Sequence, residues 1–241
     1  MKILSIGNSF SQDAHRYLTR VAKGYKLKIK AVNLYIGGCS LRTHYLNMLD
    51  DSATYDFEFC GEKTGIKVSI REALASDDWD YITLQQASPY SGHKETYHPY
   101  IEALAEYLRK YCPKAKILIH QTWAYADGSD KLRAANYESS SEMHLAAKEA
   151  YTEAAACIGA YGIIPAGDAM QRAINSGLAI HRDTFHASLG AGRYLLALTW
   201  LRAIFGIDTQ ADTFADFDGE LTSEERAVVL DAVKDIEVIG Q

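Results

Sequence analysis

Short apolar runs alternate along the chain with longer segments in which apolar residues recur every three or four positions. The short runs predict strands and the longer segments predict helices. Strands are expected at residues 2–6, 28–35, 81–84, 116–120 and 161–165. Helices are expected at residues 13–24, 99–111, 142–158, 189–205 and 222–239. Strands that alternate with helices build a parallel sheet, so the predicted fold is a three-layer α/β/α sandwich around a central parallel sheet.

One stretch interrupts this alternation. Between residues 54 and 70, two runs of alternating apolar and polar residues flank a loop with Gly61 and Gly65, which predicts a β-hairpin insertion. Near the end of the chain, Thr222 and Glu225 have the spacing of a capping box at the start of the last helix. No repeat, low-complexity tract or linker divides the sequence, so we expect a single domain over residues 1–241.

The charge balance narrows the range of partners. The sequence has 25 Lys and Arg residues against 31 Asp and Glu, a net charge of −6, and no basic stretch interleaved with aromatic residues. Nucleic acid is therefore not an expected partner. No window of about 18 apolar residues predicts a membrane span, and no basic segment favours an anionic membrane. The pattern leaves the oligomeric state open.

The first residues of the chain bear on the cellular location of the protein. The apolar start of the chain meets Gly7 at once and lacks the length of a signal peptide, so a cytoplasmic protein is expected from the sequence as it stands. A secreted or periplasmic location fits equally if a signal peptide was removed.

Cys39, Cys60, Cys112 and Cys157 are scattered without a CxxC pair, which predicts free and mostly buried thiols.

Ser9 lies where the first predicted strand turns into the first predicted helix. In open parallel sheets the ligand crevice lies outside the carboxyl ends of the strands. A serine at such a turn presents its hydroxyl at the crevice, and its backbone N–H faces incoming negative charge. Ser9 is therefore a candidate nucleophile. The competing interpretation is that Ser9 or Ser11 caps the helix.

A serine hydroxyl needs a base to activate it and a third group to orient that base. Asp183 and His186 supply both in a polar loop before the helix predicted at residues 189–205. The spacing lets the carboxylate curl back onto the imidazole Nδ1–H, while Nε2 stays free to face Ser9. An Asp-x-x-His sequence is equally compatible with a solvated loop.

Gly7-Asn8-Ser9-Phe10 together with Asp183-x-x-His186 resembles the first and last conserved blocks of the SGNH (GDSL-like) hydrolase superfamily. The likeness is strongest to a less characterised branch with the motifs GNSFS, GGCSL, WDYITLQQ and Asp-x-x-His. The resemblance implies a flavodoxin-like sandwich that hydrolyses esters of sugars, lipids or small acyl groups without a cofactor or metal. It also implies that the N–H groups of Ser9 and Gly38 form an oxyanion hole, with Cys39 as a neighbour of that loop.

Two positions differ from the usual pattern of that superfamily. Asn8 stands where the superfamily usually has Asp. The Asn that donates its amide to the oxyanion has no counterpart after the strand predicted at residues 81–84. The resemblance assigns this role to Gln86, or failing that to Gln85, because Gln has the same amide donor on a longer side chain.

Further polar and aromatic residues follow the predicted strands and are candidates for substrate contact. They are Gln85, His44, His120, Trp123 and Tyr125. Aromatic residues at strand ends are also common in protein cores, so a structural role competes with this interpretation.

The expected function is a serine esterase that removes an O-acyl group, acetyl by preference, from a carbohydrate or another small molecule. One alternative is a catalytically impaired protein on the same fold that binds a carbohydrate or small ligand. Another is a metallohydrolase, although no ligand spacing of the HExxH kind supports it. The histidines considered for that metal site are His44, His93, His98, His120 and His186.

Overall fold

The computed structural model describes residues 1–240 and contains one seven-stranded sheet in the order β4-β3-β2-β1-β5-β6-β7. Strand β1 lies at the centre and pairs in parallel with β2 and β5, while β6 and β7 continue the parallel part. Strands β3 and β4 add an antiparallel edge. The strands are β1 (Lys2–Gly7), β2 (Lys30–Tyr35), β3 (Tyr55–Phe59), β4 (Glu62–Val68), β5 (Tyr81–Leu84), β6 (Lys116–His120) and β7 (Gly162–Ile164).

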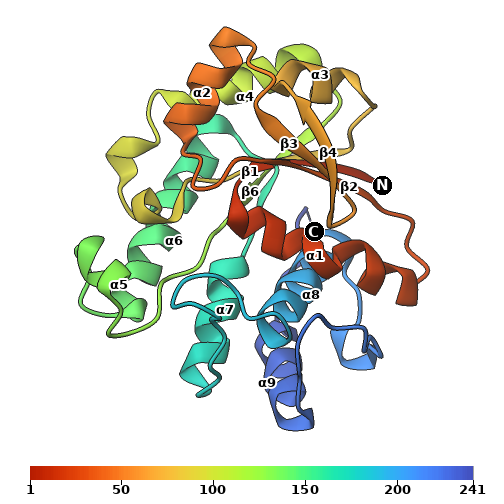
Figure 1. Cartoon of the computed structure of the whole chain (residues 1–241), viewed down its shortest axis with the longest axis vertical. Helices are drawn as coiled ribbons and strands as arrows, with labels where there is room; N and C mark the ends of the chain where they lie inside the picture. The colour runs from red at the N-terminus through yellow and green to blue at the C-terminus, as the bar shows by residue number, and fades with distance from the viewer. Residues whose placement is uncertain (241) are drawn as a thin grey trace.

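Helices cover both faces of this sheet (Figure 1). Helices α1, α7, α8 and α9 pack on one face, and α2, α3, α4 and most of α6 pack on the other. The helices are α1 (Ser9–Gly24), α2 (Leu41–Asp50), α3 (Ile70–Ala75), α4 (Tyr100–Tyr111), α5 (Asp130–Ala134), α6 (Ser140–Ile158), α7 (Ala166–Asn175), α8 (Ala191–Phe205) and α9 (Ser223–Val233).

Each face of the sheet has its own hydrophobic core because successive strand residues point in opposite directions. In β6, Leu118 belongs to the core under α1 and α8, whereas Ile117 and Ile119 belong to the core under α4 and α6. The central strands are therefore apolar on both faces, which is the pattern that predicted a buried parallel sheet. The predicted α/β sandwich is confirmed.

The predicted strands at residues 81–84 and 116–120 have the predicted bounds, and the predicted hairpin forms as β3 and β4. It extends the central sheet at its edge and contains a register shift between Phe57 and Glu58. The first helix begins at Ser9 and not at residue 13, because Asn8 caps it. The last helix ends at Val233 and not at residue 239, and the following segment pairs with the end of α8 through Ile239.

The order of the strands places a ligand crevice at the carboxyl end of β1. The chain leaves β1 for β2 on one side, and it returns through the hairpin to β5 on the other side. Crevices open at such switch points because the connecting loops diverge there. Within residues 1–240, no helix combines the length and the apolar character that crossing a membrane requires.

Candidate active site

Ser9 is fixed by the junction between β1 and α1. Asn8 is the N-cap of α1, and its side-chain oxygen accepts a hydrogen bond from the backbone N–H of Phe10 at 3.0 Å. The Asn8 backbone N–H donates to the hydroxyl of Ser11 at 3.1 Å, which completes a capping box. Ser9 is therefore the first helical residue and not the cap, so its hydroxyl is free for another partner. Of the two serines considered as caps, Ser9 has no capping role, whereas Ser11 takes part in the capping box as its third helical residue.

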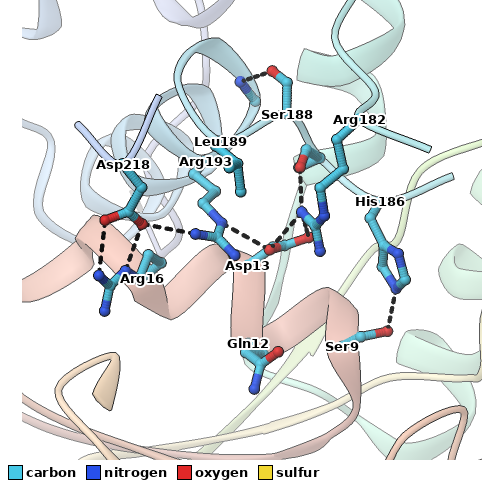
Figure 2. Close-up of polar contacts among 12 residues, drawn as sticks. Ser9, Gln12, Asp13, Arg16, Arg182, His186, Ser188, Leu189, Arg193 and Asp218 are labelled. Carbon is cyan, nitrogen blue, oxygen red and sulfur yellow. Dashed lines mark hydrogen bonds and ion pairs between the residues drawn. The ribbon is translucent and has the colours of Figure 1, made fainter. Parts of the chain in front are cut away.

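The structure brings Ser9, His186 and Asp183 together (Figure 2 shows the Ser9–His186 contact). The Ser9 Oγ lies 2.8 Å from His186 Nε2, and His186 Nδ1 lies 2.7 Å from Asp183 Oδ2. The second oxygen of Asp183 accepts a hydrogen bond from the His186 backbone N–H at 2.8 Å. Both distances in the chain Ser–His–Asp are hydrogen-bond distances, so a proton can pass between Ser9 and His186 without rearrangement.

The contact with Asp183 determines the tautomer of His186. A carboxylate only accepts, so Nδ1 of His186 is the donor, and in the neutral ring Nε2 is then the acceptor for the Ser9 hydroxyl. Burial acts to raise the pKa of Asp183, but the hydrogen bonds from the ring and backbone of His186 outweigh it and hold the pKa below its usual value. Asp183 therefore stays ionised beside an imidazole that faces the Ser9 hydroxyl.

A short antiparallel loop carries both triad partners. The backbone N–H of Arg182 donates to the His186 carbonyl at 3.0 Å, and His181 and Ala187 form a β-bridge next to it. At the tip, Thr184 has φ of 72°, a left-handed conformation that β-branched residues rarely adopt. The indole N–H of Trp123 donates to the Phe185 carbonyl at 2.8 Å. These contacts define the position of His186 from both sides of the loop.

The same loop is joined to α1 by a buried carboxylate that the sequence analysis did not identify. Asp13 is 0% exposed, and its two oxygens accept hydrogen bonds from Nη1 of Arg182 at 2.9 and 2.8 Å. Arg193 Nε donates to the same carboxylate at 2.9 Å, and Arg193 Nη1 reaches Asp218 at 2.7 Å (Figure 2). Arg16 pairs with Asp218 on the far side of this row. Asp13 thus ties the loop of His186 to the helix of Ser9.

The backbone donors expected for an oxyanion hole lie at the cleft, but Gln86 does not. Ser9 and Gly38 both line the cavity at the triad, and Gly38 has φ of 65°. The side-chain amide nitrogen of Gln86 donates to Thr96, and its oxygen accepts from the backbone N–H of Leu41 at 3.0 Å. Gln86 is therefore buried among other partners, and the prediction that its amide faces the oxyanion is wrong in this structure.

Gln85 supports the site from beneath. Its side-chain nitrogen donates to Asn8 Oδ1 at 2.8 Å, and its oxygen contacts His120 Nδ1 at 2.8 Å. The side-chain amide of Asn8 in turn donates to the Cys39 carbonyl at 3.1 Å, next to Gly38. Gln85 and Asn8 therefore connect the two loops that contribute Ser9 and Gly38 to the lining of the cleft. Neither Gln85 nor His120 lines the cavity, so the prediction that they contact substrate is wrong.

The other predicted contact residues divide between cleft and core. Tyr125 lines the cavity, where its hydroxyl lies 2.9 Å from that of Ser88. Trp123 is buried and stacks on Phe10 with ring centroids 4.2 Å apart, so it is a core residue. His44 is also buried, beside Cys39 and Tyr55. Burial raises the pKa of the Cys39 thiol to about 12, so Cys39 is not a nucleophile at neutral pH.

The cleft over the triad has a volume of about 570 Å³. Residues of both ends of the chain line it, with Tyr35 and Tyr125 on the walls and Phe185 beside His186. Two cations, Lys131 and Arg182, also line it. A cavity of this size admits a small ester or one sugar residue.

The four cysteines are free, with only Cys39 buried. Within the described part of the chain, one group of side chains has the spacing of metal ligands: His98, Glu102 and Cys157. It lies between α4 and α6 and includes none of the residues at the triad. The candidate active site itself contains a serine, a histidine and an aspartate, side chains that suit acid–base and nucleophilic chemistry.

Comparisons with known proteins agree with this architecture. A crystal structure of a DUF4886 family protein from Bacteroides uniformis is 32% identical, with a TM-score of 0.89 over 97% of this chain and 93% of that one. A protein from Slackia heliotrinireducens, provisionally assigned to the SGNH hydrolases, is 25% identical, with a TM-score of 0.58 over 83% of this chain and 96% of that one. An acetyl xylan esterase is 14% identical, with a TM-score of 0.56 over 85% and 100% of the two chains, and shares the fold.

The search of curated proteins gave no match. The family model described as "Domain of unknown function (DUF4886)" matches residues 2–235. Its match spans almost the whole chain, from β1 past the end of α9. The fold is that of the SGNH and GDSL-like hydrolases, as the resemblance in the sequence implied. The chain belongs to the DUF4886 family.

Proposed function

We propose that this protein is a serine esterase that hydrolyses an O-acyl ester, acetyl by preference, on a carbohydrate. The observation that carries the proposal is the continuous hydrogen-bonded chain from Ser9 through His186 to Asp183 at the carboxyl end of the central strand. The structural likeness to SGNH hydrolases and to an acetyl xylan esterase supports the same class of reaction.

In the proposed reaction, Ser9 Oγ attacks the ester carbonyl while His186 Nε2 takes its proton. Asp183 stabilises the imidazolium that results. The N–H groups of Ser9 and Gly38 stabilise the oxyanion, and the position of Ser9 at the start of α1 adds the positive end of the helix dipole. When the intermediate collapses, His186 gives its proton to the departing alcohol. Water then attacks the acyl-Ser9 ester, again with His186 as the base, and releases the acid.

Replacing Ser9 by Ala tests this mechanism. Hydrolysis of 4-nitrophenyl acetate should fall by about 10⁴-fold or more, because the acyl-enzyme can no longer form. Circular dichroism and thermal unfolding should match the wild type, since the hydroxyl contributes one hydrogen bond at the edge of a cleft. Ser141→Ala, on the surface of α6, is the matched control and should retain full activity. Wild-type rates in Ser9→Ala would remove Ser9 from the mechanism.

One observation favours a second candidate, a protein on this fold that binds its ligand without hydrolysing it. The side-chain donor expected at the oxyanion is absent, because Gln86 bonds to Thr96 and Leu41. A fluorophosphonate probe separates the two functions. An active esterase forms a covalent adduct at Ser9 that mass spectrometry can locate, and the adduct is lost in His186→Ala. An unlabelled wild type would favour the binding protein.

The substrate class needs a separate measurement. A screen of acetylated sugars beside aryl esters of increasing chain length, run with the Ser9→Ala variant as the blank, measures acyl and alcohol preference. The cleft of about 570 Å³ should favour short acyl groups. A preference for long acyl chains would contradict the carbohydrate ester assignment.

A further inference from the structure

The charges that line the cleft are unlike those of the whole protein. The chain has a net charge of −6, yet two cations, Lys131 and Arg182, line the cavity at the triad. The one carboxylate that lines it is Asp183, and both of its oxygens are held by His186. The cleft is therefore a positive site on an acidic protein, an arrangement that attracts anionic ligands.

Arg182 keeps part of its donor capacity. Its Nη1 group alone makes the contacts to Asp13 and to the Ala187 carbonyl. Within residues 1–240, its Nε and Nη2 groups donate to no acceptor. Asp13 is shared with Arg193, so its single negative charge does not neutralise Arg182 alone. In the view of Figure 2 the Arg182 guanidinium lies between Asp13 and His186, and Arg182 lines the same cavity as Ser9. The free edge of a fixed guanidinium matches the two oxygens of a carboxylate.

Lys131 supplies a second positive charge to the lining of the cleft, next to Phe185. Its ammonium lies 4.2 Å from the centre of the Phe185 ring, and that ring lies 3.8 Å from the His186 ring, centre to centre. Lys131 forms no ion pair with any carboxylate in the part of the chain that the structure describes. It also lines a neighbouring hollow of about 500 Å³, which shares Pro89 and Tyr125 with the main cleft. A ligand can therefore reach it from either hollow.

We propose that the ester substrate carries a carboxylate that binds between Lys131 and the free edge of Arg182 while its ester carbonyl faces Ser9. This inference rests on the proposed function for the ester, but its binding part can be tested without turnover. The carboxylate can belong to the acyl group, as in a hemisuccinate ester, or to the alcohol, as in an acetylated uronic acid. Both place the same anion near the same cations.

Matched pairs of esters separate these two sources. The acyl pair is 4-nitrophenyl succinate and its methyl ester, and the alcohol pair is O-acetyl glucuronic acid and its methyl ester, followed by acetate release. Each pair differs by one negative charge at nearly constant shape. The wild type should prefer the acid of at least one pair by about tenfold in kcat/KM, the discrimination that one charge-assisted hydrogen bond supplies. Raising the ionic strength should reduce this ratio.

Variants of Lys131 link the preference to the cleft. Lys131→Gln should lower the acid-to-methyl-ester ratio several-fold, and Lys131→Glu should lower it further or invert it. Lys114→Gln is the matched control. Lys114 is an exposed lysine just before the amino end of β6, whereas Ser9 follows the carboxyl end of the parallel strand β1. That control should keep the wild-type ratio. A ratio of one or less for both pairs in the wild type, or a ratio that no Lys131 variant changes, overturns the proposal.

Titration of the Ser9→Ala variant with the uncleaved acid and methyl ester, followed by NMR, measures binding alone. Tighter binding of the acid by about tenfold, lost in the Ser9→Ala/Lys131→Glu double variant, supports the anion site even if the wild type hydrolyses neither ester. Tighter binding of the acid without hydrolysis of any ester tested would reject the esterase and keep the anion site. Hydrolysis of neutral esters, together with equal binding of the acid and its methyl ester, would support the esterase and reject the anion site.

Discussion

Asp13→Asn tests whether the buried carboxylate on α1 holds the triad together. The substitution keeps the shape of the side chain and removes its charge. It leaves Arg182 and Arg193 facing a neutral amide, one of whose two polar atoms is a donor and repels their N–H groups. Because Arg182 belongs to the loop of His186 and Asp13 to the helix of Ser9, the change acts on the contact between the two halves of the triad.

The magnitude follows from burial. Removing one partner of a fully buried ion pair destabilises a protein by about 3–5 kcal/mol. Here the carboxylate is fully buried, but the side chains of Arg182 and Arg193 are 27% and 14% exposed, and Arg193 keeps Asp218. We therefore expect a loss of about 2–3 kcal/mol in the free energy of unfolding. For a chain of this length, this corresponds to a fall of roughly 5–10 °C in Tm.

Activity should fall as well, at temperatures where the variant is still folded. A loop that is less firmly held spends less time with His186 within reach of Ser9, so kcat should drop about tenfold while KM for a small aryl acetate changes little. The rate of fluorophosphonate labelling should drop by the same factor, because it also depends on activated Ser9. A purely structural role for Asp13 would lower Tm and leave kcat unchanged.

Asp216→Asn is the matched control for this experiment. Asp216 is a surface carboxylate paired with Arg20, and its side chain is 76% exposed. A pair of this kind contributes at most about 1 kcal/mol. Within residues 1–240, Asp216 bonds only to Arg20 and contacts neither Asp13 nor the loop of His186. If Asp13→Asn behaved like Asp216→Asn in both Tm and kcat, Asp13 would not hold the loop of His186 to the helix of Ser9.

Two further changes test the support beneath the cleft and the outer ion pairs. Gln85→Ala should lower the free energy of unfolding by about 1–3 kcal/mol and reduce kcat, because Asn8 and His120 both lose a buried partner; equal stability in urea unfolding would contradict this. The hydrogen bond from Arg16 lowers the pKa of Asp218 to about 2, so ionised Asp218 stabilises the fold fully at pH values above its usual pKa near 3.8, and this stabilisation is lost as the pH falls through about 2. Discounted for solvent screening, Asp218→Asn should be about 1 kcal/mol less stable than the wild type at pH 7, and the difference should disappear as the pH falls below 2; a difference that stays constant over this range would refute the assignment.

The candidate nucleophile and its candidate base could be located from the sequence because their signals are local. Ser9 follows a strand and opens a helix within a few residues, and Asp183 and His186 share one short loop. Their meeting across 177 positions of sequence was implied only by the resemblance to a known pattern of blocks. Asp13 had no such signal. It lies one helical turn after Ser9, but its partners are 169 and 180 positions away.

The role expected of Gln86 could have been corrected from strand parity. Ile82 and Leu84 belong to the core under α4 and α6, whereas Thr83 bonds to Ser5 beneath α1. Continued alternation turns Gln85 toward α1 and Gln86 away from it. The structure has this arrangement, with Gln85 on Asn8 and Gln86 on Leu41. The choice of partners still depends on Thr96 and Leu41, which no local pattern specifies.

With Gln86 turned away, the proposed mechanism assigns stabilisation of the oxyanion to backbone N–H groups. A side-chain donor in an oxyanion hole contributes about 3 kcal/mol to the transition state, or roughly a hundredfold in rate. Without such a donor, the proposed reaction depends on how well the Ser9 and Gly38 N–H groups are aligned with the oxyanion. Asn8 controls that alignment, because it caps α1 and donates to the carbonyl of Cys39 in the Gly38 loop. In the proposed mechanism Asn8 therefore positions both backbone donors without contacting the substrate, and Gln85 holds Asn8 in place.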